Sequence, residues 1–436
     1  MSQQPSEILA RSRMGTMQVM AVAMCVLLNA LDGFDVLSIS FAAPGISDEW
    51  NISRGALGVV LSMELIGMAV GSILLGRIAD QIGRRPTILM CLVVMVAGMF
   101  LVPFADGLGE LSAYRLLTGL GIGGMLASTN AMVAEYANAR WRTLAVTVMA
   151  AGYPLGAIVG GSISSVLLAH YDWRAVFFFG GAVTALFLPL VMILLPESIE
   201  YLDRRRPRGA LERINKTLKQ MGHTTVAALG DVVEKTGGKG FRQLFGPALA
   251  KTTVLLTLAY FAHIMTFYFI LKWIPKIVVD LGYAPALAGG VLVAANIGGM
   301  AGSILLGLLS VRVNTRWLVI AALTFAFATV TYFGQGQETL GQLALVSAIA
   351  GFCTNSAVVG LYALFVEAFP TEVRAGGTGV VIGVGRGGAA LGPIVAGFLF
   401  ETGFGLSTVA LVMASGSLIA AAALLMLGRK RVTAAA

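Results

Sequence analysis

Residues 71–76 read Gly-Ser-Ile-Leu-Leu-Gly, and the same six residues reappear at 302–307, an offset of 231. The same offset carries Gly67 onto Gly298. Self-similarity at a fixed large offset indicates that a chain contains two copies of one structural unit. This stretch therefore predicts two related halves.

A second set of matches follows further along the chain, at an offset of 232. Glu135 aligns with Glu367, and Gly156 aligns with Gly388. The matched positions extend through most of each half. Any fold assigned to the first half must therefore also serve for the second.

The composition indicates whether the folded chain is surrounded by water or by lipid. Of 436 residues, 57% are hydrophobic and 12% are charged, against about 25% charged in soluble domains. A bilayer-spanning helix needs about 20 apolar residues. Twelve segments meet this requirement, at 17–43, 56–79, 86–105, 110–134, 143–169, 174–195, 250–280, 285–309, 316–334, 339–367, 374–402 and 404–428.

The predicted fold is an all-α membrane protein with twelve transmembrane helices in two six-helix bundles, related by a pseudo-two-fold axis. We expect an N-terminal bundle at 1–196, a cytoplasmic linker at 197–249 with a short amphipathic helix around 209–220, and a C-terminal bundle at 250–436. An even number of helices per half keeps both copies in one orientation, as in transporters built from parallel repeats.

Positive charge defines the topology. Of the 30 Lys and Arg residues, 24 fall in the termini, alternate loops and the 197–251 stretch. The three in the remaining loops are Arg54, Arg174 and Lys276, and the three inside spans are Arg115, Lys272 and Arg386. Because Lys and Arg gather on the cytoplasmic side, we expect a multi-pass protein of the cell (inner) membrane with both termini cytoplasmic. The net charge of +8 thus indicates topology and not nucleic-acid binding.

Cys25, Cys91 and Cys353 each lie alone in an apolar span, which favours packing over metal ligation or a disulfide. The apolar run after Arg13 is too long for a signal peptide, so we interpret it as an uncleaved first helix. The sequence contains no metal-ligand cluster, nucleophile motif or phosphate loop. We therefore expect neither an enzyme nor a cofactor.

The turn at 76–85 reads Gly-Arg-Ile-Ala-Asp-Gln-Ile-Gly-Arg-Arg. It resembles the signature loop of the major facilitator superfamily, Gly-x-x-x-Asp-x-x-Gly-Arg-Arg, which latches the two halves during alternating access. The copy at 307–316 is degenerate, since Val311 and Asn314 replace the Asp and the second Gly. A generic positively charged turn is the alternative. We expect gating to involve residues of this turn and two arginines of the matched loops further along each half. These residues are Gly76, Asp80, Gly83, Arg84, Arg85, Arg142 and Arg374.

Helix 5 carries Gly156 and Gly160, and helix 11 carries Gly388 and Gly392. Small residues four positions apart allow helices to approach closely in lipid. We interpret these glycines as packing and hinge elements, with direct contact to a substrate as the alternative.

Two acids lie inside the first span. Asp32 and Asp35 are one helical turn apart and share a face. Ionisable groups are costly in a bilayer and mark functional sites, and neighbouring carboxylates favour uptake of a proton by one of them. The pair suits proton coupling. The alternative is that both lie near a helix end and are merely hydrated.

Four stretches resemble the aromatic acid:proton symporter family: Asp32-Gly-Phe-Asp35, the loop from Glu135-Tyr136 to Arg142, Leu271-Lys-Trp-Ile-Pro275, and Arg374 to Pro393. The resemblance spans both halves and implies uptake of an aromatic carboxylate with a proton. The residues that matter for transport in that family fall here on Asp32, Asp35, Asp80, Arg115, Glu135 and Arg386. We expect proton coupling at Asp32, Asp35, Arg115 and Glu135.

Other intramembrane groups suggest a substrate site. Lys272 and Glu64 are charged where neutral residues are common in relatives; Lys272 contacts the substrate or snorkels to the interface. His263 binds substrate, shuttles protons or packs helices. The second half thus holds Lys272 and Arg386 against the acids of the first, which suits a carboxylate bound to one half and a proton to the other. Aromatic rings that could face a substrate ring, or simply pack, are Phe34, Tyr153, Tyr268, Trp273 and Tyr362.

The sequence therefore predicts a proton-coupled symporter that imports a small organic, aromatic acid. Its partners would be the acid, H⁺ and the lipid bilayer, and a monomer is the default. A proton-driven exporter and a transporter-like sensor of the acid remain as alternatives.

Overall fold

The computed structural model describes residues 4–229, 243–247, 249–370 and 373–427. Within these ranges twelve helices are long and apolar enough to cross a membrane, as the composition predicts. Parts of the predicted linker, 230–242 and 248, and the C-terminal 428–436 lie outside the described residues.

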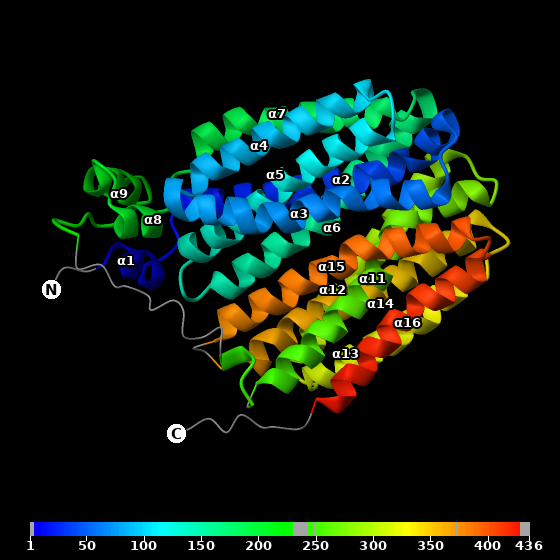
Figure 1. The fold of residues 1–436 in the computed structure, drawn as a ribbon. Helices are drawn as coiled ribbons and strands as arrows, with labels where there is room; N and C mark the ends of the chain where they lie inside the picture. The colour runs from blue at the N-terminus through cyan, green and yellow to red at the C-terminus, as the bar shows by residue number, and fades with distance from the viewer. Residues whose placement is uncertain (1–3, 230–242, 248, 371–372, 428–436) are drawn as a thin grey trace. The chain divides into compact units, whose positions relative to one another are not determined.

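The chain divides into two compact units (Figure 1). Unit 1 comprises the described residues of Met1–Ile52, Met63–Lys235 and Ala284–Gly290, and unit 2 those of Ser53–Ser62, Thr236–Tyr283 and Val291–Ala436. Two short segments, 53–62 and 284–290, therefore group with the half to which they do not belong in chain order.

The first six spanning helices are α2 (Thr16–Trp50), α3 (Arg54–Ile82), α4 (Arg84–Leu101, continued by the 3₁₀ turn η1, Val102–Phe104), α5 (Leu108–Tyr136), α6 (Arg142–His170) and α7 (Arg174–Leu194). Three shorter helices lie outside the spans: α1 (Pro5–Arg11), α8 (Ile199–Arg205) and α9 (Ala210–Gln220). α9 confirms the predicted amphipathic helix; it buries Ile214 and Leu218. α1 was not predicted, and it buries Ile8 and Leu9.

The second six spanning helices are α11 (Ala250–Asp280), α12 (Pro285–Ser310), α13 (Thr315–Phe333), α14 (Leu340–Ala368), α15 (Arg374–Glu401) and α16 (Leu406–Met426). The ends of the predicted spans agree with these bounds to within a few residues, except in α2. The first span was predicted to end at 43, whereas α2 runs to Trp50 and contains Pro44 inside the helix. It ends at Asn51, which adopts the left-handed conformation that Asn tolerates.

Glycines set the close helix contacts, and the contacts repeat between the units. In unit 1 a Cβ on Gly156 would lie 1.7 Å from the carbonyl oxygen of Ala30, so α6 packs directly on the backbone of α2. In unit 2 a Cβ on Gly388 would lie 2.3 Å from the carbonyl oxygen of Phe261, between α15 and α11. These two contacts are related by the 231- and 232-residue offsets of the sequence.

A second contact repeats in the same way. A Cβ on Gly119 of α5 would lie 2.1 Å from the carbonyl oxygen of Glu64 on α3, and one on Gly351 of α14 would lie 2.0 Å from that of Ala295 on α12. The internal repeat is therefore a repeat of backbone packing, and these glycines are packing elements.

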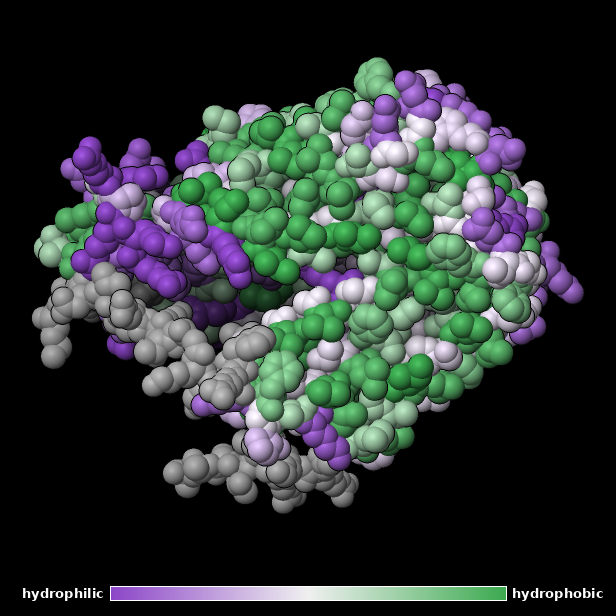
Figure 2. All heavy atoms as spheres, viewed as in Figure 1, coloured by the Kyte–Doolittle hydropathy of each residue, from purple (hydrophilic) through white to green (hydrophobic). Residues whose placement is uncertain are grey.

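Figure 2 shows hydrophobic side chains over the middle of the spanning helices that face the viewer, and hydrophilic ones over α8 and α9. This distribution is expected for a protein whose helices cross lipid while their ends lie in water. The chain is thus a multi-pass membrane protein.

Candidate functional site

Asp32 and Asp35 lie in the interior of unit 1, with 2% and 0% of their surfaces exposed. α2 continues for four turns beyond them to Trp50. A position at a hydrated helix end is therefore excluded, and both acids are intramembrane groups.

Arg115 and Glu64 form an ion pair beside these acids, between α5 and α3. Neither side chain has exposed surface. A terminal nitrogen of Arg115 also donates to the backbone carbonyl of Asp35 at 2.8 Å, and its guanidinium lies 5.5 Å from the centre of the Phe177 ring. Arg115 thus ties α2, α3, α5 and α7 together.

The carboxyl group of Asp35 lies close to both members of this ion pair and faces Gly180 and Thr184 of α7. Two carboxyl groups, those of Asp35 and Glu64, therefore lie near a single guanidinium. In such an arrangement, the protonation of one acid changes how strongly the other is held by the cation. The expected roles of Asp35 and Arg115 and the possible role of Glu64 are compatible with this geometry.

Two of the candidate aromatic residues belong to the same region. Phe34 packs against Gly160 of α6 and Gly180 of α7. It also makes an edge-to-face contact with Phe179, with the ring centres 5.6 Å apart. Its ring fills space between helices, which favours a packing role. Tyr153 is half-buried, and its carbonyl oxygen would lie 2.0 Å from a Cβ on Gly33.

In unit 2, both ring nitrogens of His263 have protein partners. Nε2 lies 2.9 Å from the carbonyl oxygen of Thr354 on α14, and Nδ1 lies 3.0 Å from the hydroxyl of Ser417 on α16. The structure therefore favours the packing alternative for His263, because it joins three helices.

Trp273 also packs in the interior of unit 2. Its indole N–H donates to the carbonyl oxygen of Pro393 at 3.2 Å, and its ring lies 5.1 Å from that of Phe400. The neighbouring Lys272 has no exposed surface. It does not snorkel to the interface, which leaves its expected role as an intramembrane cation.

Tyrosines gather around Tyr260 of α11, a residue that the sequence analysis did not single out. Its hydroxyl lies 2.9 Å from that of Tyr362 on α14. Arg386 and Tyr268 lie close enough to interact electrostatically with this hydroxyl. The helices thus bring Arg386, Tyr362 and Tyr268 close to Tyr260, and the expected contact of these three residues with a substrate stays a prediction. Tyr260 gave no signal because its spacing within an apolar helix is that of a packing residue.

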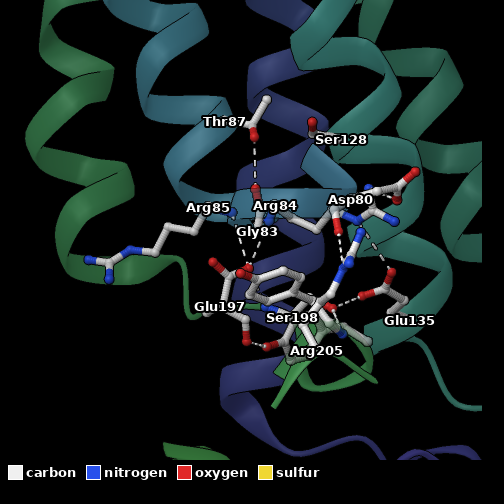
Figure 3. Close-up of polar contacts among 12 residues, drawn as sticks. Asp80, Gly83, Arg84, Arg85, Thr87, Ser128, Glu135, Glu197, Ser198 and Arg205 are labelled. Atoms are coloured by element: carbon white, nitrogen blue, oxygen red, sulfur yellow. Dashed lines mark hydrogen bonds and ion pairs between the residues drawn. The ribbon is translucent and has the colours of Figure 1, made fainter. Parts of the chain in front are cut away.

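The turn between α3 and α4 forms a second polar cluster (Figure 3). Arg84 pairs with Asp80 at 2.8 Å and lies 3.7 Å from Glu135. Glu135 accepts a hydrogen bond from the hydroxyl of Ser198, the N-cap residue of α8. The signature loop is thus joined to the end of α5 and to the segment that follows α7.

Glu197 is hydrogen-bonded to the backbone of this turn. Its carboxylate accepts hydrogen bonds from the backbone N–H groups of Arg84 (2.9 Å) and Arg85 (3.2 Å) at the start of α4, where an anion is favoured. Gly83 has φ +111°, and a Cβ there would lie 2.3 Å from Glu197 Oε2. Burial raises the pKa of Glu197 above its usual value. The signal that could have identified it is an acid directly after a span on the positively charged side.

Glu135 belongs to this cluster and not to the intramembrane one. It was grouped with Asp32, Asp35 and Arg115, but twenty helical residues separate it from Arg115, which is roughly 30 Å along α5. The structure therefore places Glu135 at the turn between α3 and α4, as a partner of Arg84, and its expected part in proton coupling stays a prediction.

Of the remaining gating candidates, Gly76 lies within α3, whereas Arg142 and Arg374 lie at the starts of helices. Gly76 is open to a side chain, with its nearest neighbour 3.8 Å away, so no close contact requires glycine there. Arg142 begins α6 and lines a small pocket with Glu135. Arg374 begins α15 and donates to the carbonyl oxygen of Phe369 at 3.3 Å.

The degenerate second loop keeps part of this arrangement. Thr315, at the position that matches Arg84, donates to Glu367, which matches Glu135, at 2.9 Å. Arg85 and Arg316 also match, and each donates to a backbone carbonyl near the end of the sixth helix of its half, at Met192 and Leu425. In the second loop a hydrogen bond thus replaces the charge pair, and the contact of the arginine with the sixth helix is kept.

In the part of the chain that the structure describes, a buried acid–arginine cluster, a charged turn and twelve spanning helices with an internal repeat are typical of a membrane transporter. Residues 25–333 and 256–435 match the Major Facilitator Superfamily. The chain belongs to this superfamily and, within it, to the aromatic acid:proton symporter family.

Named relatives cover nearly the whole chain. A gallate transporter of Pseudomonas putida is 31% identical over 424 residues, covering 96% of this chain and 93% of the relative. The 4-hydroxybenzoate transporter PcaK of the same organism is 32% identical over 380 residues, covering 85% and 84%. The xylose transporter XylE from E. coli, in an inward-open conformation, matches with a TM-score of 0.74 at 16% identity, covering 95% of this chain and 97% of that one. The last match supports the fold alone.

Proposed function

We propose that this protein is a proton-coupled symporter that imports an aromatic carboxylate by alternating access. It would act as a monomer in the cell inner membrane with both termini cytoplasmic, and use the proton as its coupling ion without a further cofactor. The observation that carries the proposal is the fully buried cluster of Asp35, Glu64 and Arg115. The names of the relatives support the substrate class.

The cluster supplies a coupling step. Asp35 and Glu64 both lie near Arg115, so protonation of Asp35 would leave the guanidinium more firmly paired with Glu64. Loss of the proton would restore the competition between the two carboxylates. Because Arg115 contacts α2, α3 and α7, the change in pairing would affect the packing of the first bundle. It would thereby shift the equilibrium between the conformations of the alternating-access cycle.

The substrate would carry the opposite charge to the groups of the second bundle. Arg386 and the buried Lys272 are cations that can hold a carboxylate, and the tyrosines near Arg386 provide polar groups and rings. Substrate and proton would thus bind to different halves of the transporter.

Uptake into proteoliposomes tests the proposal. Radiolabelled 4-hydroxybenzoate should accumulate above its outside concentration only when the outside is more acidic than the inside. The Asp32→Asn/Asp35→Asn double variant should lose this uphill accumulation and still exchange substrate. Asp48→Asn, on the exposed end of the same helix, should accumulate substrate like the wild type.

The outcomes also separate the alternatives. Expulsion of the acid when the outside is acidic would identify an exporter, and binding without flux would identify a sensor. Full proton-driven accumulation by the double variant would remove the assignment of the helix-1 acids as the coupling site.

A further inference from the structure

The tyrosine pair of unit 2 has a geometry that simple packing does not require. The hydroxyls of Tyr260 and Tyr362 lie 2.9 Å apart, and their rings are 5.7 Å apart with a tilt of 46°. Both rings also contact Phe365 by their edges. Two phenols therefore meet by their polar ends inside a spanning bundle.

Tyr260 is fixed in place. It is 3% exposed, and its ring lies against Gly385 of α15, where a Cβ would lie 2.0 Å from the ring. Glycine at 385 thus makes room for the ring and places the next residue, Arg386, beside it. The Tyr260 hydroxyl is in this way held between α11, α14 and α15.

Tyr362 is 39% exposed, on a face of α14 that also exposes Val366 one turn further along the helix. Leu345 and Ile349 are the exposed apolar side chains in the first half of this helix, and Tyr362 projects about 140° from Ile349 at 3.6 residues per turn. Arg386 likewise projects about 140° from the exposed Leu391 of α15. Arg386 therefore points away from Leu391, and Tyr362 points away from Ile349 but shares its face of α14 with Val366.

The pair retains hydrogen-bonding capacity. Each phenol has one O–H donor and two acceptor lone pairs. When one hydroxyl donates to the other, one proton and several lone pairs remain for a third group. Arg386, within electrostatic range of this pair, favours an anion close to it.

On the basis of the function proposed above, we infer that the Tyr260–Tyr362 hydroxyl pair is a specificity element that binds the ring hydroxyl of a hydroxylated aromatic acid. A substrate phenol can complete a three-hydroxyl network here, whereas an acid with an unsubstituted ring leaves the two tyrosines bonded only to each other. Because the pair is already satisfied without the ligand, the discrimination is modest, roughly five- to tenfold.

Competition uptake tests this inference. In proteoliposomes, labelled 4-hydroxybenzoate and benzoate are compared as substrates of the wild type, Tyr362→Phe and Tyr260→Phe. The wild type should favour 4-hydroxybenzoate by roughly five- to tenfold in kcat/KM. Tyr362→Phe keeps the ring and its packing, so it should bring the ratio close to one while the KM for benzoate stays within about twofold. Tyr260→Phe should act in the same direction.

Tyr332→Phe is the matched control, because Tyr332 is 59% exposed on α13; it should keep the wild-type ratio. An unchanged ratio in both Tyr362→Phe and Tyr260→Phe, an equal loss of both acids, or a wild type that does not prefer the hydroxylated acid would overturn the inference while leaving the symporter intact. A wild type that accumulates neither acid would contradict the proposed function itself.

Discussion

Arg115 and Glu64 form an ion pair inside unit 1 in which neither side chain has any exposed surface. Removing one partner of such a pair leaves an uncompensated charge in a medium that solvates it poorly, which typically costs about 3–5 kcal/mol. The stability of the first bundle therefore depends strongly on each of these two side chains.

We expect Glu64→Gln to lower the unfolding temperature of the purified protein strongly, by a destabilisation of about 3–5 kcal/mol. Asp172→Asn is the control, since Asp172 lies 3.5 Å from Arg174 and is 59% exposed. Exposed pairs contribute about 0–1 kcal/mol, so this variant should melt close to the wild type. Equal melting of the two variants would argue against a buried pair.

The contact between Gly156 and Ala30 yields a second prediction. A Cβ on Gly156 would lie 1.7 Å from the Ala30 carbonyl oxygen, so Gly156→Ala must push α6 away from α2. We expect a loss of about 1–3 kcal/mol or more from overpacking, measured by thermal unfolding. Gly290→Ala, which meets open space, should have little effect. A neutral Gly156→Ala would show that the two helices are not in close contact.

Glu197 makes stability depend on pH. Its pKa is raised by burial, so between its usual value, near 4.5, and the raised value the folded state binds more protons than the unfolded state. Stability from this group is present below pH 4.5 and is lost as the pH rises through the raised pKa. The melting temperature of Glu197→Gln should therefore vary less with pH across this window than that of the wild type.

The comparison needs a variant that removes an acid without this burial. Glu212→Gln alters an exposed acid of α9, in the same segment between α7 and α11, and should keep the wild-type pH dependence. A wild-type slope that Glu197→Gln leaves unchanged would place the titration at another group.

His223 acts with the opposite sign. Desolvation lowers its pKa below 6.5, and its Nε2 lies 2.9 Å from the side-chain oxygen of Gln18 at the start of α2. The folded state binds fewer protons, so the stability from this group is present above pH 6.5 and is lost as the pH falls through the lowered pKa. His223→Asn should flatten the decline in melting temperature below pH 6.5. A decline of unchanged steepness would rule out His223 as the group whose titration causes it.

Much of the fold could be predicted from the sequence because the governing quantities are local. The length and apolarity of a span are properties of one segment, and the repeat can be seen by comparing the chain with itself. The same holds for Asp32, Asp35 and Arg115, since a charge inside an apolar run is visible without a structure.

Pairings between side chains could not be predicted in this way, because they depend on the rotation of helices that are distant in sequence. Glu64 was recognised as unusual, but its partner Arg115 lies two helices later. Glu135 was grouped by family role, and only its place along α5 separates it from Asp35. Glu197 lay in a segment interpreted as a linker, and Tyr260 in a run of apolar residues.

The sequence offset between the two halves changes by one residue between the starts of their third and fourth spanning helices. α4 and α13 begin 231 residues apart, at Arg84 and Thr315, whereas α5 and α14 begin 232 apart, at Leu108 and Leu340. The additional residue therefore falls between the start of one helix and the start of the next. One residue added inside a helix turns everything after it by about 100°, which would move Gly119 or Gly351 off the carbonyl that it faces. An insertion before these helices leaves their glycines in register, so the backbone contacts between helices determine where this chain tolerates a change of length.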